Sequence, residues 1–484
     1  MPRVRRRAAN RESWFGHPNV PRLHAESAQE VARKPARGAW RASGRCAATR
    51  LLAAGLLAAG CGGPPPPNLL LITVDTLRRN HLGCYGHSRS TSPAIDAFAA
   101  SAVRFDRAYA TAPWTKPSIA SIFTGLHPGG HGASGVGRVL SEKVTTLAEI
   151  LSDQGWATAG FVTHRMLRPE NGFHQGFDVY HDGLAEGDDS VTSPRLTSQA
   201  IAMLQRLVKS EEPFFLFVHY FDPHYTYNAH ADIDFAPKQV GRLEGTESIH
   251  LLRRLAGNIT SNEVAFLRDL YDEEVALTDR GIGQLLAELT RLGRAENTLV
   301  VLTADHGEEF FERGWIGHTR SLYEELVQVP LIIRDPTVNR PGAVVTQPVS
   351  LVSITPTVLD LLGVDASRYE FHGASLTPLL GGTEPAEALP AGPVLTEVEY
   401  RPARHEMPVK LTVKQAVIVG SRKLIRDGLT GNIELFDLAA DPGEVDNLAA
   451  TDPGGVAQLL RPLRSRARPD PPRRVPGRSA QAFR

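Results

Sequence analysis

The chain has 484 residues, of which 42% are hydrophobic, which is enough for more than one core. We therefore expect one large domain and a smaller one. The formal net charge is zero at pH 7, but residues 1–60 hold 12 basic and 3 acidic residues, so the remainder carries a charge of −9. A mildly acidic body argues against a nucleic-acid-binding protein.

The N-terminal region predicts export. Basic residues precede the apolar run 51–60, which ends at Cys61 and is followed by a proline-rich linker, with residues 61–67 forming one unit. This order is typical of a secretory signal and is too short to span a bilayer. It resembles a bacterial lipoprotein signal, which implies lipidation of Cys61 and a membrane anchor in the cell envelope, facing the periplasm or the exterior. Cleavage without lipidation is the alternative. Residues 1–60 are then a signal and an N-terminal extension.

Residues 68–75 form a continuous apolar run that ends in Asp75. This pattern predicts a buried parallel strand with Asp75 at its carboxyl end, the edge where open α/β sheets bind ligands. Asp75 is therefore either a metal ligand or an N-cap for the next segment. A capped amphipathic helix is expected at residues 91–99, and a short strand at 105–110.

Residues 112–125 predict a tight turn that runs into a helix. Pro117 suits the first helical position and Gly125 can end the helix. A hydroxyl at a helix start meets unpaired N–H groups and the positive end of the dipole, so Thr115 is the candidate nucleophile. The alternative is an ordinary N-cap threonine. Lys116 would add positive charge for binding the substrate.

Further buried strands are predicted at residues 158–163 and 213–221. His219 lies inside the second strand, where we expect it to pack, whereas His224 lies beyond it on a loop and is the better site candidate. Helical spacing is found at residues 198–208 and 262–292.

A strand beginning at residue 298 delivers Asp305 and His306 to its carboxyl end, and Gly307 lets the backbone turn. Since Asp75 ends another strand in the same way, we expect these residues to bind a metal. His318 lies in a glycine-containing loop before the strand at residues 329–333, and a helix is expected at 353–363.

Several motifs in this order resemble the sulfatase branch of the alkaline phosphatase superfamily, over about residues 68–449. The resemblance implies an α/β fold, an alkaline phosphatase-like sandwich with a large, mostly parallel sheet between helices and a small antiparallel C-terminal subdomain. It also implies catalytic and substrate-binding roles for His224, which would hold the anion, and His318, which would protonate the leaving group. The motifs are Asp75-Thr76-Leu77-Arg78, Gly83-Cys84-Tyr85-Gly86, Ser92-Pro93-Ala94-Ile95-Asp96, Pro117-Ser118 and Thr124-Gly125.

The predicted domains follow from these patterns. Residues 68–390 form the sulfatase-like catalytic domain, and residues 391–455 form the antiparallel subdomain, with strands at 409–419, 422–426 and 433–438. Residues 456–484 are basic and rich in proline, and we expect a disordered tail.

Asp75, Asp305, His306 and the Thr115 hydroxyl form one oxygen-rich ligand set with a single imidazole. That set suits one divalent metal ion, and ligand type alone does not choose between Ca2+, Mg2+, Mn2+ and Zn2+. Bound metal would activate the hydroxyl for attack on phosphorus or sulfur, giving a covalent ester.

The sequence departs from the sulfatase pattern at two positions. Sulfatases carry Cys or Ser at the position of Thr115, which is oxidised to formylglycine, and Arg at the position of Ile119. Oxidation of threonine would give a ketone rather than the aldehyde whose hydrate attacks sulfate, so no formylglycine is expected. With a threonine as its nucleophile, the site resembles the sites of the phosphoglycerol and phosphoethanolamine transferases of the superfamily.

Three functions follow from these residues. The first is a metal-dependent sulfatase-family hydrolase acting on an anionic ester of sulfate, phosphate or phosphonate. The second is an envelope transferase of phosphoglycerol or phosphoethanolamine groups. The third is a non-catalytic sulfatase-like protein, which the cost of burying an uncompensated set of acids argues against.

Overall fold

The computed structural model describes residues 66–185, 191–338, 340–382, 392–401 and 411–464. The predicted signal, Cys61 and most of the basic tail lie outside the described residues. Among the helices within those ranges, none combines the length and the apolar character needed to cross a bilayer.

A nine-stranded sheet forms the centre of the described part, in the order β10-β2-β9-β6-β1-β5-β3-β4, with β11 also pairing with β2. Its strand pairs are parallel except for those of β9, which is antiparallel to both β2 and β6. The strands are β1 (Asn68–Val74), β2 (Val103–Tyr109), β3 (Ala157–Val162), β4 (Val179–His181), β5 (Phe214–Tyr220), β6 (Thr298–Ala304), β9 (Gln328–Arg334), β10 (Ala343–Val345) and β11 (Val349–Ser350).

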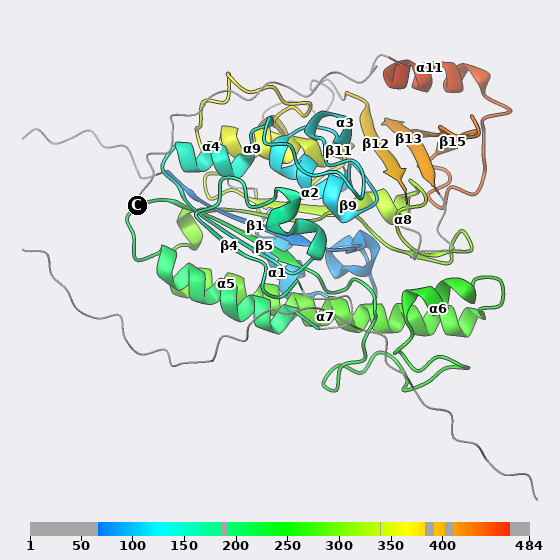
Figure 1. Cartoon of the computed structure of the whole chain (residues 1–484), viewed down its shortest axis with the longest axis horizontal. Coiled ribbons are helices and arrows are strands. Elements are labelled where there is room, and N and C mark those ends of the chain that lie inside the picture. The colour runs from blue at the N-terminus through cyan, green and yellow to red at the C-terminus, as the bar shows by residue number, and fades with distance from the viewer. Residues whose placement is uncertain (1–65, 186–190, 339, 383–391, 402–410, 465–484) are drawn as a thin grey trace, which may run out of the picture. The chain divides into compact units, whose positions relative to one another are not determined.

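Helices cover both faces of this sheet (Figure 1). On one face α5 (Ser193–Leu207) packs against α7 (Ser261–Arg291), and α7 contacts α1 (Pro93–Ala100). On the other face α2 (Thr115–Thr124) contacts α4 (Leu147–Asp153) and α9 (Ile354–Leu361). The remaining helices are α3 (Pro128–His131), α6 (Ile249–Arg254), α8 (Glu324–Val327), α10 (Thr377–Gly381) and α11 (Pro453–Arg464). This arrangement confirms the predicted sandwich.

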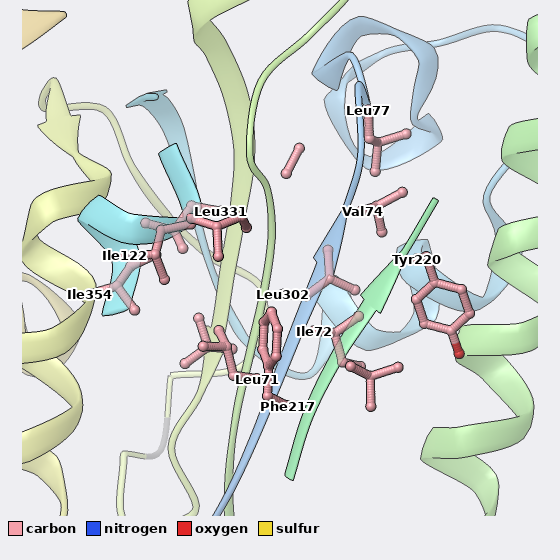
Figure 2. Close-up of a cluster of buried hydrophobic side chains, with 14 of the residues drawn as sticks. Leu71, Ile72, Val74, Leu77, Ile122, Phe217, Tyr220, Leu302, Leu331 and Ile354 are labelled. Carbon is pink, nitrogen blue, oxygen red and sulfur yellow. The ribbon is translucent and has the colours of Figure 1, made fainter. Parts of the chain in front are cut away.

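Apolar side chains from both faces fill the core. Figure 2 shows Ile122 of α2 and Ile354 of α9 to one side of β1, and Tyr220 of β5 to the other. The inner strands β1, β5 and β6 are buried on both faces, which explains their continuous apolar runs.

Strand register brings the predicted site residues to one edge. β1 lies between β5 and β6, and Val74 is opposite both Tyr220 and Ala304. The residues that follow these strands, Asp75 and Asp305 among them, therefore emerge side by side at the carboxyl edge.

A second sheet is antiparallel, as predicted, and contains β12 (Val394–Tyr400), β13 (Thr412–Val419), β14 (Arg422–Asp427) and β15 (Ile433–Asp437). β12 was not predicted from the sequence. A short hairpin, β7 (Glu309–Phe310) with β8 (Ile316–Gly317), completes the strands of the described residues.

The predicted disorder of the tail is wrong for its first residues, because α11 extends to Arg464. Leu459 and Leu463 lie one turn apart on this helix and pack against Val417 and Leu435 of the second sheet. The packing of these two leucines stabilises the helix, although arginines surround them in the sequence. Residues 465–484 lie outside the described ranges.

A buried ion-pair network joins β14 to the segments around it. The ammonium group of Lys423 is fully buried and lies 2.8 Å from Glu324 Oε1 and 2.8 Å from Glu444 Oε1. Glu324 also accepts a hydrogen bond from the hydroxyl of Tyr109 in β2. One cation therefore compensates two acids between the sheets.

We predict that Lys423→Met lowers the free energy of unfolding by about 3–5 kcal/mol, because it leaves two carboxylates buried without their cation. Urea titration monitored by circular dichroism measures this loss. Arg426→Met on the same strand removes an exposed cation and should cost less than about 0.5 kcal/mol. Equal losses in the two variants would contradict a stabilising role for Lys423.

Candidate active site

Two buried acids and a histidine meet at the carboxyl edge of the large sheet. Asp75 and Asp305 are fully buried, and His306 Nε2 lies 3.5 Å from Asp75 Oδ1 and 3.5 Å from Asp305 Oδ2. Burial and the charge of Asp305 raise the pKa of Asp75 well above its usual range. Burial opposes protonation of His306, but the two carboxylates raise its pKa above the ordinary value.

Thr115 is the first residue of α2 and points toward these acids. Its Oγ1 lies 3.4 Å from Asp75 Oδ2 and 3.4 Å from His306 Nε2. The helix begins two residues before Pro117, which we expected at the first position. A proline in the first turn removes no helical hydrogen bond, because N–H groups there have no helical acceptor. Ser118 Oγ donates to the carbonyl of Asp305 at 2.6 Å, which ties the helix start to the metal-site loop.

The donor atoms around Asp75 fit a bound cation. Asp75 Oδ1, Thr76 Oγ1, His219 Nε2 and Asp305 Oδ2 are buried and have no hydrogen-bond partner among the described residues. His306 Nδ1–H donates to the carbonyl of Gly307 at 2.8 Å, which directs Nε2 toward the acids, and a cation that displaces the proton from Nε2 would meet its lone pair there. Buried carboxylates without a compensating charge are costly, and a divalent cation at this position would supply that charge.

His219 belongs to this site, contrary to the expectation that it only packs within its strand. Its Nε2 lies 3.4 Å from Asp75 Oδ2, and donor atoms of Asp75, His219 and Asp305 group within 4.8 Å of one another. The sequence did contain a signal for this role. His219 lies two residues before Phe221, close to the carboxyl end of its apolar run, and that end lies at the same edge of the sheet as Asp75. Burial lowers the pKa of His219 to about 4, so the ring is neutral at pH 7.

His318 and His224 lie beside the acids, with ring centroids 5.1 Å apart. The ring of His318 is 4.5 Å from that of His306. Its Nδ1 is 2.9 Å from Glu308 Oε1, a partner that the sequence reading missed. Burial raises the pKa of Glu308 to about 7 and lowers that of His318, so the carboxyl of Glu308 is the group of this pair that gains or loses a proton near neutral pH.

His224 Nδ1–H donates to the carbonyl of Tyr225 at 2.9 Å, which leaves Nε2 available for a ligand. Burial lowers the pKa of His224 well below its usual value. A buried His164, also missed, lies nearby, with its ring 5.5 Å from that of His224 and 6.5 Å from that of His219. Three strand ends and one helix start therefore contribute to one site.

Lys116 differs from its predicted role. Its ammonium group donates to the carbonyls of Val136 and Arg138 at 2.7 and 2.9 Å and to Asn171 Oδ1 at 3.2 Å. Burial lowers its pKa to about 8. The side chain thus fixes a neighbouring loop and does not present its charge to a substrate; residue type and position could not reveal which way the long side chain turns.

A second group of potential ligands contains His81, His87 and Asp272. Here the carboxylate is already paired with an arginine, because Arg89 Nη1 lies 2.6 Å from Asp272 Oδ2, and the other carboxylate oxygen is hydrogen-bonded to His81 Nδ1 at 2.6 Å. The group around Asp75 has no such cation among the described residues, and it is the better metal site.

We predict that Asp75→Asn abolishes stabilisation by divalent ions but raises the stability of the chelator-treated protein by about 1–3 kcal/mol, because one of two repelling acids becomes neutral. Thermal unfolding with EDTA and with added Mn2+ or Zn2+ measures both effects. The control is Asp272→Asn, which removes a buried but compensated carboxylate and should only destabilise. A chelator-treated Asp75→Asn protein less stable than the wild type would contradict the prediction.

The sequence matches known proteins over most of its length. The family model described as "Sulfatase" matches residues 67–364, and the model "N-sulphoglucosamine sulphohydrolase, C-terminal" matches residues 311–466. The chain is 24% identical over 424 residues to "Uncharacterized sulfatase YidJ" of Escherichia coli, covering 79% of this chain and 82% of that protein. It is 27% identical over 447 residues to "Choline-sulfatase" of Rhizobium meliloti, covering 81% and 84%.

Solved structures share the fold. The phosphonate monoester hydrolase of Agrobacterium radiobacter superposes with a TM-score of 0.68 at 23% identity, covering 83% of this chain and 96% of that chain. A Bacteroides thetaiotaomicron protein described as a putative sulfatase gives 0.68 at 21% identity, covering 83% and 92%. Because the family model spans well over half of the chain, this protein belongs to the sulfatase family of ester hydrolases.

Proposed function

We propose that this protein is a metal-dependent hydrolase of sulfate or phosphorus esters, with Thr115 as its nucleophile. The observation that carries the proposal is the position of the Thr115 hydroxyl, at the N-terminus of α2 and 3.4 Å from both Asp75 and His306. Names of relatives support both ester classes, since one is a choline-sulfatase and another a phosphonate monoester hydrolase.

Asp75, Asp305, His306 and the hydroxyl of Thr115 would hold one divalent cation. When bound, it supplies positive charge that lowers the pKa of the hydroxyl and screens the substrate oxyanion. The buried, unpartnered oxygens of Asp75 and Asp305 support this assignment.

In the proposed reaction, Thr115 Oγ1 forms a bond to sulfur or phosphorus while the bond from that atom to the leaving oxygen breaks. Asp75 Oδ2 is the carboxylate oxygen that faces the hydroxyl proton. The first-turn N–H groups of α2 stabilise the negative charge that grows on the non-bridging oxygens. In this step the proton of the hydroxyl passes to Asp75 Oδ2. A water oxygen then forms a bond to the same sulfur or phosphorus while the bond from that atom to Thr115 Oγ1 breaks, Oγ1 takes a proton back from Asp75, and the free sulfate, phosphate or phosphonate leaves with the water oxygen.

The Glu308–His318 pair supplies the proton for the leaving oxygen. The pair holds one proton near neutrality, which passes from the carboxyl through His318 Nδ1 and leaves from Nε2. Departure of a poor leaving group requires this proton, whereas a stable phenolate can leave without it. Glu308 is therefore the proton reservoir and His318 the group that contacts the substrate.

His224 binds a non-bridging oxygen of the substrate through Nε2. An oxyanion placed there favours the protonated ring and offsets the burial that keeps His224 neutral in the free protein. Binding of the substrate and uptake of a proton by His224 are thus coupled.

A transferase is the second candidate, and Thr115 is the residue that favours it. If an acceptor alcohol instead of water reaches the ester on Thr115, the same residues transfer the group. We also propose that lipidated Cys61 tethers the protein to an envelope membrane, where such an acceptor or an ester substrate would be found.

We predict that Thr115→Ala lowers kcat/KM by about 10⁴–10⁶-fold on every ester that the wild type cleaves, because the nucleophile is lost. The assay uses the metal-loaded protein with aryl sulfate, phosphate monoester, phosphodiester and phosphonate ester substrates, with and without an acceptor alcohol such as glycerol.

The matched variant Thr115→Ser keeps the hydroxyl and should retain activity within about 10²-fold. Turnover by Thr115→Ala at the wild-type rate would overturn the assignment of the nucleophile. Products found only on the added alcohol would favour the transferase, and no turnover despite bound metal would favour a non-catalytic protein.

We predict that Glu308→Gln lowers kcat by about 10²–10⁴-fold on alkyl esters but by less than about 10-fold on nitrophenyl esters, because only the alkoxide needs a proton. Steady-state kinetics over a series of leaving groups measures this difference.

Tyr227→Phe is the matched control, since the Tyr227 hydroxyl donates to Glu308 Oε2 at 3.1 Å without supplying the transferred proton. It should change the two classes of ester equally. A Glu308→Gln variant that loses the same factor on both classes would contradict a role in proton donation.

A further inference from the structure

We propose that His219 is a further ligand of the cation, so that the site contains two imidazoles and selects a borderline ion such as Zn2+ over Ca2+ or Mg2+. This inference rests on the cation site of the proposed function. The ligand set predicted from the sequence contained a single imidazole, His306, and several other histidines, His219 among them, were only possible further ligands. The position of His219 in the folded chain changes the donor set.

Strand geometry directs His219 toward the acids. Phe217 and His219 are two residues apart on β5 and share a face of the sheet, and the ring of Phe217 packs edge-on against Phe123 of α2 at 4.8 Å. His219 therefore lies on the face covered by α2, the helix that carries Thr115. Asp75 directly follows the neighbouring strand, β1.

The ring of His219 is held with Nε2 toward Asp75. Its Nδ1 forms a 2.8 Å hydrogen bond with Oγ1 of Thr73, and Thr73 is the residue of β1 that lies opposite His219 in the strand register. With Nδ1 as the donor, the neutral ring presents the lone pair of Nε2. This is the arrangement of a metal-binding histidine, whose other nitrogen is fixed by a polar partner.

Nε2 itself has no hydrogen-bond partner among the described residues, although it is fully buried. An imidazole nitrogen left in this state is costly, and an apolar side chain would fill the strand position without that cost. The 3.4 Å separation from Asp75 Oδ2 matches the separation of about 3.3–3.5 Å between donor atoms that share a tetrahedral ion at roughly 2.0–2.1 Å.

Asp75 lies between the two imidazoles. Its Oδ1 is 3.5 Å from His306 Nε2 and its Oδ2 is 3.4 Å from His219 Nε2. Two nitrogen and two carboxylate donors favour borderline ions such as Zn2+, whereas Ca2+ and Mg2+ prefer sites built from oxygen.

The test is the EPR spectrum of the full chain loaded with one equivalent of Cu2+, since nitrogen superhyperfine splitting counts the coordinated imidazoles. We expect two nitrogens in the wild type and one in His219→Gln. Asp75→Asn should replace this spectrum with that of Cu2+ without the two-nitrogen splitting, which identifies the site. One nitrogen in the wild type, or an unchanged spectrum in His219→Gln, would overturn the assignment.

Metal titrations provide an independent readout. We expect His219→Gln to raise the Kd for Zn2+ by at least about 100-fold while the Kd for Ca2+ changes by less than about 3-fold, because glutamine offers an oxygen in place of nitrogen. The matched control His131→Gln removes a buried imidazole that bonds to Ser121 and Ala133, and it should leave both constants unchanged. Equal losses for Zn2+ and Ca2+ in His219→Gln would contradict the proposal.

Thr73→Val tests the same assignment without altering the ligand, and it decides the matter if His219→Gln does not fold. Loss of the hydroxyl frees the ring of His219, and the Kd for Zn2+ should rise by about 10-fold. An unchanged Kd would count against His219 as a ligand. A wild-type protein that binds neither Zn2+ nor Cu2+ would remove the cation site of the proposed function as well, whereas a tightly bound single-imidazole ion would remove only the role of His219.

Discussion

Repulsion between two buried carboxylates is the constraint on which this site depends. Asp75 and Asp305 follow adjacent parallel strands, so the register of β1 with β6 forces these two buried acids together. Hydrophobic burial of the inner strands stabilises this arrangement, and the acids oppose it. Such a site is stable only when a positive charge joins the two acids, which links folding of the sheet edge to binding of a cation.

The groups around the acids form an inner and an outer layer, and the two layers suit different chemical roles. Near the carboxylates, Thr115 and His306 lie within contact of Asp75, where they are suited to metal binding and nucleophilic attack. Further out, His318 and His224 form a layer of imidazoles that burial keeps neutral in the free protein. In the proposed reaction these imidazoles would bind the anionic ester and protonate its leaving group, and Glu308, whose pKa burial raises to about 7, would supply the proton.

Thr115 distinguishes this chain from the formylglycine pattern of its family, and the surrounding structure keeps a site that suits its hydroxyl. Ser118 anchors the helix start to the carbonyl of Asp305, and Ile119 is fully buried in the core. Lys116 holds the neighbouring loop by three hydrogen bonds. Ile119 thus stands where the family pattern has an arginine, and the positive charge of Lys116 is directed to a loop and away from Thr115.

The sequence by itself determined the central strands of the large sheet, the helices α1, α2, α5, α7 and α9, and the acids at the sheet edge. Apolar runs ending in Asp75 and Asp305 encode buried parallel strands and the place where they stop. The sequence also predicted the start of α2 at Thr115 to within two residues. Tertiary structure alone decided where long or strand-borne side chains point: Lys116 toward a loop, His219 toward Asp75, and Glu308 against His318. Hydrophobic periodicity predicts which face a residue occupies, but it does not predict what the polar atoms of that residue contact. The partners of Lys116, His219 and Glu308 lie on other loops or strands, and they come within reach only when the chain has folded.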